Sequence, residues 1–267
     1  MRQKRIISFL VLLICMVSAL FSQSLFDDLI NNSMEDLENK VNLLGVNFKD
    51  FPYVSYYIAN AKTIRDETVA FLIKKGANVN QSDKDYLPAI FYATIRNNLQ
   101  VVQTLIKAKA DVNALVEFNG KLKDMNNKFS MDSFWEIEAM THVKQTKASP
   151  LDFALSYSTS AIVKELLAAK ADPLLVLHQV PDATNSKVTK NYTIIDGAFS
   201  YIASCIRDKI SPAWPFFHKT YLIWKEVAKL PTAKQPIMPY ADNIYSYFIA
   251  GDAASVKKSL AAISGDT

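Results

Sequence analysis

Apolar residues recur every three or four positions over several short stretches of this chain, which is the period of a helix with one buried face. In the stretch 162–167 (Ile-Val-Lys-Glu-Leu-Leu), Val163, Leu166 and Leu167 share one side of such a helix. The preceding stretch 149–155 (Ser-Pro-Leu-Asp-Phe-Ala-Leu) opens with a capping serine and a proline that the first helical turn accepts. The pattern predicts pairs of short helices joined by tight corners.

The helix pair is repeated along the chain. The stretch 72–80 (Leu-Ile-Lys-Lys-Gly-Ala-Asn-Val-Asn) returns 33 residues later as 105–113 (Leu-Ile-Lys-Ala-Lys-Ala-Asp-Val-Asn), and a third copy spans 166–173. One pair cannot bury its own apolar face, so neighbouring pairs are expected to stack. Asn80 and Asn113 end the first two copies, where their side chains can satisfy the backbone of the turn that follows.

The motifs and their spacing resemble the ankyrin repeat, a unit that contains Thr-Pro-Leu-His-x-Ala-Ala, Val-Val-x-Leu-Leu and Gly-Ala-Asp-Val-Asn. Asp152 stands where the family prefers histidine. The resemblance is closest over 69–113 and 149–172, and weaker copies extend it over 25–263. It implies an all-α fold, an ankyrin-like helix-pair solenoid of about five to six repeats.

Two stretches interrupt the regular spacing. A long insertion at 114–148 is rich in aromatic residues, and 174–191 contains a proline and several polar residues, which favours an exposed loop. The copies at 193–263 diverge from the motifs, with the second helix of one pair expected at 216–227. The whole segment 23–267 is therefore interpreted as one ankyrin-repeat domain.

The N-terminus has the pattern of a secretory signal peptide. Three basic residues lie within the first five positions, and an almost continuous apolar run follows at 6–20. We expect residues 1–22 to be removed on export, most readily to a bacterial periplasm. Alternatives are release from the cell, lipidation at Cys15 and an uncleaved membrane anchor, so membrane contact is expected only through this N-terminus.

Charge and cysteine content narrow the choice of partners. The formal net charge is +4, and without the three N-terminal basic residues 27 basic side chains face 26 acidic ones. A chain so close to neutrality has no overall field that would attract nucleic acid. Cys205 is the one cysteine outside the signal, so packing rather than a disulfide must stabilise the fold. We expect a monomer.

Candidate chemistry is sparse. The histidines His142, His178 and His218 have no ligating residue at the spacing of a helical or hairpin metal site. The chain contains neither a glycine-rich phosphate loop nor a Gly-x-Ser-x-Gly nucleophile elbow. We therefore expect a non-catalytic protein without a metal or cofactor, in which only His142 and Trp135 form a pair of interest.

The resemblance implies that the chain recognises a protein partner across a concave face. The positions that vary within the family correspond here to seven residues of the second and third copies, and the insertion adds two aromatic residues beside them. The predicted partner-binding residues are Lys84, Asp85, Leu87, Ile95, Arg96, Phe134, Trp135, Ser156 and Tyr157. Phe134 and Trp135 could instead fold back and shield the stack.

Three roles fit such a module. The protein could be a binding scaffold outside the cytoplasm with one unidentified protein partner. It could be released and act on host proteins, or it could support a cell-envelope enzyme in the manner of a chaperone. The sequence does not choose among these partners, because the binding positions of a repeat are those that the fold leaves free to vary.

Overall fold

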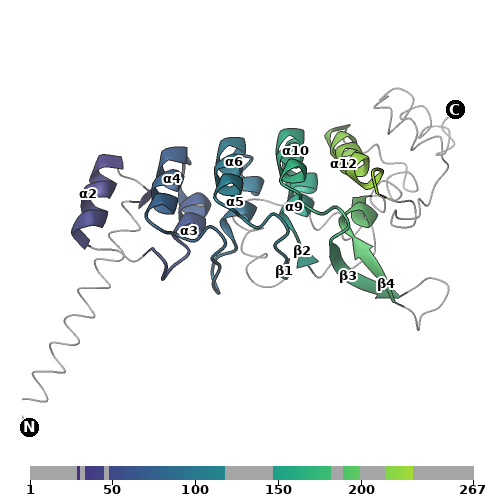
Figure 1. The fold of residues 1–267 in the computed structure, drawn as a ribbon, viewed down its shortest axis with the longest axis horizontal. Helices are drawn as coiled ribbons and strands as arrows, with labels where there is room; N and C mark the ends of the chain where they lie inside the picture. The colour runs from purple at the N-terminus through teal and green to yellow at the C-terminus, as the bar shows by residue number, and fades with distance from the viewer. Residues whose placement is uncertain are drawn as a thin grey trace, which may run out of the picture.

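Short helices stand side by side in two rows along the long axis of the molecule (Figure 1). The computed structural model describes residues 29–30, 34–44, 48–117, 147–181, 189–198 and 214–230. The helices are α2 (Met34–Leu44), α3 (Tyr53–Asn60), α4 (Asp66–Lys74), α5 (Ala89–Ile95), α6 (Leu99–Lys107), α9 (Pro150–Tyr157), α10 (Ser160–Ala168) and α12 (Trp214–Val227). The strands are β1 (Val116–Glu117), β2 (Lys147–Ala148), β3 (Val176–Pro181) and β4 (Thr189–Thr193).

Each repeat is a packed pair of helices, and the pairs stack through like helices. The pairs are α3 with α4, α5 with α6, and α9 with α10. The first helices α3, α5 and α9 contact one another in sequence, as do the second helices α4, α6, α10 and α12. α2 stands at the N-terminal end of this stack (Figure 1). The described chain is thus the predicted ankyrin-like helical repeat, and α12 occupies the predicted place of a second helix.

The helix boundaries follow from local chemistry. The Ser149 hydroxyl accepts a hydrogen bond from the Asp152 N–H at 3.2 Å, and Pro150 occupies the first helical turn of α9. The Asn98 side chain caps α6 in the same way through the Val101 N–H. The second helices end in a left-handed residue, which is Lys109 after α6 (φ 67°) and Lys170 after α10 (φ 72°).

One apolar core runs through the whole stack. Leu72, Leu105 and Leu166, which occupy the same position in three successive second helices, are all fully buried. The first helices contribute large aromatic side chains, and the rings of Phe91 and Phe153 meet edge to face with 5.6 Å between their centroids. Since no repeat buries these side chains by itself, each repeat depends on its neighbours.

Two asparagines join successive repeats in the same manner. Asn80 accepts from the Asp111 N–H at 2.7 Å and donates to the Lys109 carbonyl at 3.0 Å. Asn113 accepts from the Asp172 N–H at 2.7 Å and donates to the Lys170 carbonyl at 3.1 Å. Both side chains satisfy turn backbone, but in the next repeat rather than, as the sequence had predicted, in the turn that follows each asparagine. We call this pair of links the asparagine ladder.

Short strands form beside the helices at two places. β1 and β2 are antiparallel, with Val116 opposite Ala148 and Glu117 opposite Lys147, so the two ends of the insertion lie side by side. β3 and β4 form a longer antiparallel pair, in which Leu177 is 1% exposed. The prediction of an exposed loop at 174–191 was wrong for its first part, where β3 forms and Leu177 and His178 are buried. Thr189 and Asn191 are exposed as predicted, but they lie in a strand rather than in a loop.

In the part of the chain that the structure describes, none of the helices combines the length and the apolar content needed to cross a bilayer. The predicted signal peptide lies outside the described residues, as do most of the insertion and the end of the chain.

Candidate partner-binding surface

The loop that joins α4 to α5 carries three of the predicted binding residues. Lys84 and Asp85 are exposed at its tip, in a position to meet a partner. Leu87 is only 2% exposed, since it packs into the core at the start of α5. Its side chain is therefore not part of the surface, and this residue of the prediction is corrected.

Ile95 and Arg96 lie at the other end of α5, where Arg96 has a structural task. Its guanidinium donates to the carbonyls of Ile58 (2.8 Å) and Lys62 (3.1 Å) and to that of Ala61, at the end of α3. Burial lowers the pKa of Arg96 below its usual value. Ile95 is half-buried. These contacts hold Arg96 against α3, so it offers a partner less of its charge than an exposed arginine would.

The remaining predicted residues divide into two groups. Ser156 and Tyr157 are half-buried in the last turn of α9, with the Tyr157 ring 5.9 Å from that of Phe153. Phe134 and Trp135 lie outside the described residues, as does His142, so their binding role stays a prediction.

A cluster of aromatic rings near the first predicted tip was not foreseen from the sequence. Phe51 contacts Tyr53, Tyr56 and Tyr86 edge to face, with centroids 5.1, 5.8 and 5.8 Å apart, and Tyr56 lies 5.7 Å from Tyr86. All four side chains are half-buried, so one edge of the cluster reaches solvent. Tyrosine is enriched in protein interfaces because a rigid ring gives contact area and its hydroxyl gives a polar contact.

Carboxylates surround these rings. Burial first, and the negative charge of Asp50 second, raise the pKa of Tyr53. For Tyr86, burial also raises the pKa most, a hydrogen bond from Asn60 opposes it, and the charges of Asp85 and Asp83 add to it. The four rings with Asp50, Asp83 and Asp85 form a surface that we call the aromatic–acidic patch.

The tip beside the patch is held in one shape. The Asp83 carboxylate accepts from the backbone N–H groups of Asp85 and Tyr86, both at 2.8 Å. Such a turn fixes the directions of Lys84 and Asp85 relative to the rings. A preformed surface of this kind loses less conformational entropy on binding than a loop that must be ordered.

The described residues contain few other groups suited to catalysis or metal binding. They hold no group of three or more His, Cys, Asp and Glu side chains arranged to bind a metal ion. His178 is buried against the Tyr192 ring at 4.5 Å, and this burial lowers its pKa. The Nδ1 atom of His218 lies 2.9 Å from the Ser160 hydroxyl, and no carboxylate of the described chain is bonded to that ring.

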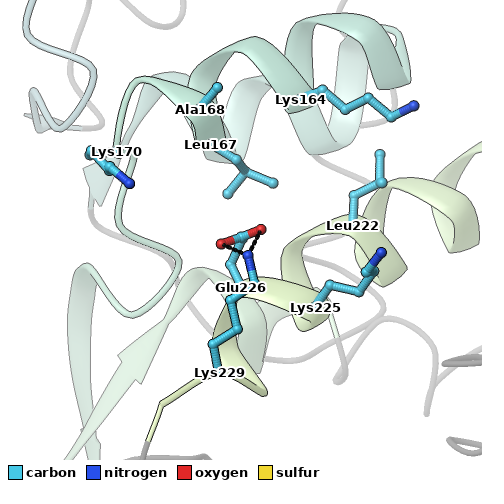
Figure 2. Close-up of a pocket in the computed structure, with 8 residues that line it drawn as sticks. All are labelled: Lys164, Leu167, Ala168, Lys170, Leu222, Lys225, Glu226 and Lys229. Atoms are coloured by element: carbon cyan, nitrogen blue, oxygen red, sulfur yellow. Dashed lines mark hydrogen bonds and ion pairs between the residues drawn. The ribbon is translucent and has the colours of Figure 1, made fainter.

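A second surface lies between α10 and α12, where the two helices leave a groove of about 290 Å³ (Figure 2). Its apolar floor is formed by the side chains of Leu167, Ala168 and Leu222. Charged side chains line the rest, namely Lys164, Lys170, Lys225, Glu226 and Lys229. We call this the lysine groove.

Comparison with known proteins identifies the family of repeats to which part of the stack belongs. The family model for ankyrin repeats in many copies matches residues 64–117, which contain α4, α5 and α6. Residues 64–117 are ankyrin repeats. Ankyrin repeats are in general non-catalytic modules that bind other proteins. Tyr86, Asp83 and Asp85 of the patch lie within this segment, and the rest of the patch lies just before it.

The other comparisons are more distant. No curated protein matches the chain. Among solved structures, one similar chain belongs to the complex of a predatory endopeptidase from Bdellovibrio bacteriovorus with an immunity protein. The match covers 76% of this chain and 97% of that chain at 16% identity, with a TM-score of 0.36.

Proposed function

We propose that the protein is a non-catalytic binding module that acts outside the cytoplasm and holds a protein partner through the aromatic–acidic patch. The observation that carries this proposal is the patch itself, in which four clustered rings reach solvent beside a rigid loop tip of an ankyrin repeat. Within the described repeats, Leu115 is the one large apolar side chain that is itself well exposed.

The chemistry of the patch favours a partner with basic side chains. An arginine or lysine placed on a tyrosine face gains a cation–π contact, and Asp50, Asp83 and Asp85 add opposite charge around the rings. Lys84 at the same tip limits this preference, because it would repel a cation placed next to it. The favoured contact is therefore with the rings and with Asp50, away from Lys84.

The location outside the cytoplasm is supported by the N-terminal sequence, in which a basic start precedes an apolar run. Fractionation of the native organism tests it: the protein is expected in the periplasm or the medium, shortened at its N-terminus. Full-length protein confined to the cytoplasm would overturn this part of the proposal. Presence in the medium alone would favour the host-directed role.

Binding is tested by crosslinking and affinity capture with the full-length protein, compared with the Tyr56→Ala, Tyr86→Ala double variant. We expect one partner for the native protein and at least a tenfold weaker capture with the variant, since aromatic anchors often contribute most of the binding energy. Lys107→Ala is the control, since it removes an exposed side chain of α6 that belongs to neither surface and should leave capture unchanged.

The result also separates the remaining roles. Loss of the partner on removal of the tyrosines supports a discrete binding site. Capture of a cell-envelope enzyme that is indifferent to these substitutions would favour the supporting, chaperone-like role. Capture of no protein from any fraction would overturn the binding proposal.

A further inference from the structure

The lysine groove has a strong local charge that the composition of the chain conceals. Four lysines and one glutamate line it, and Glu226 is bonded to Lys229 through both carboxylate oxygens at 2.7 Å. Within the described residues, Lys164, Lys170 and Lys225 form no ion pair. Because Glu226 is paired with Lys229, the other three lysines line the groove as an excess of three positive charges.

The side chains approach the groove from several sides. Lys164 comes from α10, Lys170 from the turn that follows α10, and Lys225 from α12 (Figure 2). Lys225 also lies over the Tyr221 ring, with its Nζ 5.7 Å from the centroid, which is a cation–π contact. A ligand in the groove would thus meet cations from both helices at once.

The apolar floor of the groove favours an anionic ligand that also carries an apolar group. Leu167 and Leu222 are half-buried between the lysines, and Figure 2 shows both side chains directed into the space between the two helices. An inorganic phosphate would neutralise charge but leave these apolar atoms in water. A bilayer would contact a protruding or flat basic surface more readily than a recess between helices.

We propose that the lysine groove binds a short extended protein segment with an acidic side chain on each side of an apolar one. In an extended segment, side chains two positions apart point to the same face about 6.6 Å from each other. The apolar side chain would cover Leu167 and Leu222, while the carboxylates meet Lys164 or Lys225 on one side and Lys170 on the other. The site lies on helices other than those of the aromatic–acidic patch, so it provides a second contact of opposite charge.

The probe is a labelled peptide, acetyl-Gly-Glu-Ser-Leu-Ser-Glu-Gly-amide, titrated against the full-length protein at low salt. Saturable binding is expected, with a dissociation constant on the order of 10–100 μM. A peptide in which glutamine replaces both glutamates should bind at least tenfold more weakly. Binding should also weaken several-fold when salt is raised from about 50 to 300 mM, because exposed charges are screened.

Variants of the protein locate the site. Lys164→Glu combined with Lys225→Glu should weaken the peptide at least tenfold. Glu226→Gln should tighten it about threefold, because it removes the one negative charge of the groove and releases Lys229. The matched control is Lys74→Glu with Lys107→Glu, which makes the same charge change on exposed positions of α4 and α6.

Several outcomes would overturn the inference. They are saturable binding that the control pair weakens as much as the groove pair does, equal affinity for the glutamine peptide, and no peptide binding at millimolar concentration. Binding of phosphatidylserine vesicles or inorganic phosphate in place of the peptide would assign the groove to those anions instead. Circular dichroism of each variant shows whether the fold is retained, and since the substituted lysines are exposed, we expect that it is.

Discussion

Helices of two turns leave many backbone carbonyls without a partner inside the helix, so their ends need other donors. In this stack a cationic side chain of the next repeat supplies the missing donors. Arg96 of the second described repeat donates to carbonyls at the end of α3, and Lys219 of α12 donates to those of Ala154 (3.3 Å) and Ser158 (2.9 Å) at the end of α9. Both cations also meet the negative end of a helix dipole.

Lys219 makes these contacts at an energetic cost, because it is 4% exposed and has no carboxylate partner among the described residues. Burial lowers its pKa from 10.5 to about 8. Between these two values the unfolded chain binds more protons than the folded chain, so this group makes stability rise with pH across that window. Below pH 8 the full cost of about 3 kcal/mol applies.

Comparison of the native protein with Lys219→Met tests this account. The free energy of unfolding of the native protein, relative to that of the variant, should rise by about 2 kcal/mol between pH 7 and pH 9.5. Urea denaturation at the two pH values measures it, and the variant serves as the control for all other titrating groups. A difference that does not change with pH would contradict the lowered pKa of Lys219.

Individual residues varied in how far the sequence could predict them. Ser149 was predictable because it caps backbone three residues away. Asn80 and Asn113 were expected to act on the turn that follows each of them, whereas they bond to backbone of the next repeat. The lysine groove was not, since its side chains come from two helices far apart in the sequence and form no basic run. Each of its lysines, taken alone, has the pattern of an exposed helix face.

At the scale of elements, β1 and β2 join the insertion to the stack in a way that would allow its removal without a change in the helix pairs. β1 and β2 place Glu117 opposite Lys147 in an antiparallel ladder. Residues opposite each other in such a ladder lie about 5 Å apart, a span that a two-residue turn can close. The chain can therefore leave the repeat and return to it without opening the helix pairs on either side.

Replacement of residues 118–146 by Asn-Gly tests this separability. If those residues do not pack on the stack, the free energy of unfolding should stay equal or rise by up to about 2 kcal/mol, because a shorter loop is less costly to close. Chemical denaturation measures the change, and a Gly/Ser segment of native length controls for loop length. A loss of more than about 2 kcal/mol in both variants would show that Phe134 and Trp135 shield the stack.

Helices with caps and a regular apolar period in the sequence were predicted well, whereas the strands β3 and β4, which have no such sequence pattern, were not predicted. The caps, the apolar stripe and the left-handed turn of α9 and α10 all occur within one repeat length, so the sequence determines them together. β3 and β4 lack such signals, because a bulge between Val176 and His178 breaks the alternation of β3, and Tyr192 is the one apolar or aromatic residue of β4. Their burial depends on the neighbouring repeat rather than on their own pattern.

The whole molecule is a linear array, in which the main helix contacts join neighbouring repeats. Stability in such an array is close to a sum of terms for each repeat and each interface. The charges are distributed along the same axis, with the aromatic–acidic patch on the first repeats and the lysine groove between α10 and α12. Damage to a central interface should therefore affect both sides of the stack.

Two leucine substitutions compare the effect of damage at the centre of the stack with that of damage at its N-terminal end. Leu105 in α6 and Leu37 in α2 are both fully buried, and truncation of Leu105 to alanine should reduce the free energy of unfolding by about 2–5 kcal/mol. Amide hydrogen exchange should then speed up in α4 and α10 alike. Leu37→Ala should speed exchange in α2 while leaving α10 unchanged; an equal effect of both variants on α10 would contradict the linear model.

The asparagine ladder also has a consequence for how far along the stack one kind of link between repeats extends. Each amide bonds to two backbone groups of the next repeat, one at 2.7 Å and the other at 3.0 or 3.1 Å. At the corresponding place after the third copy the residue is Leu174, whose side chain has no amide to reach forward. Beyond that point other side chains make the links between layers: Lys219 donates to the carbonyls of Ala154 and Ser158, and Ser160 is bonded to His218. The ladder therefore ends before α12, and the lysine groove lies beyond its last link, between two helices that bonds of a different pattern hold together.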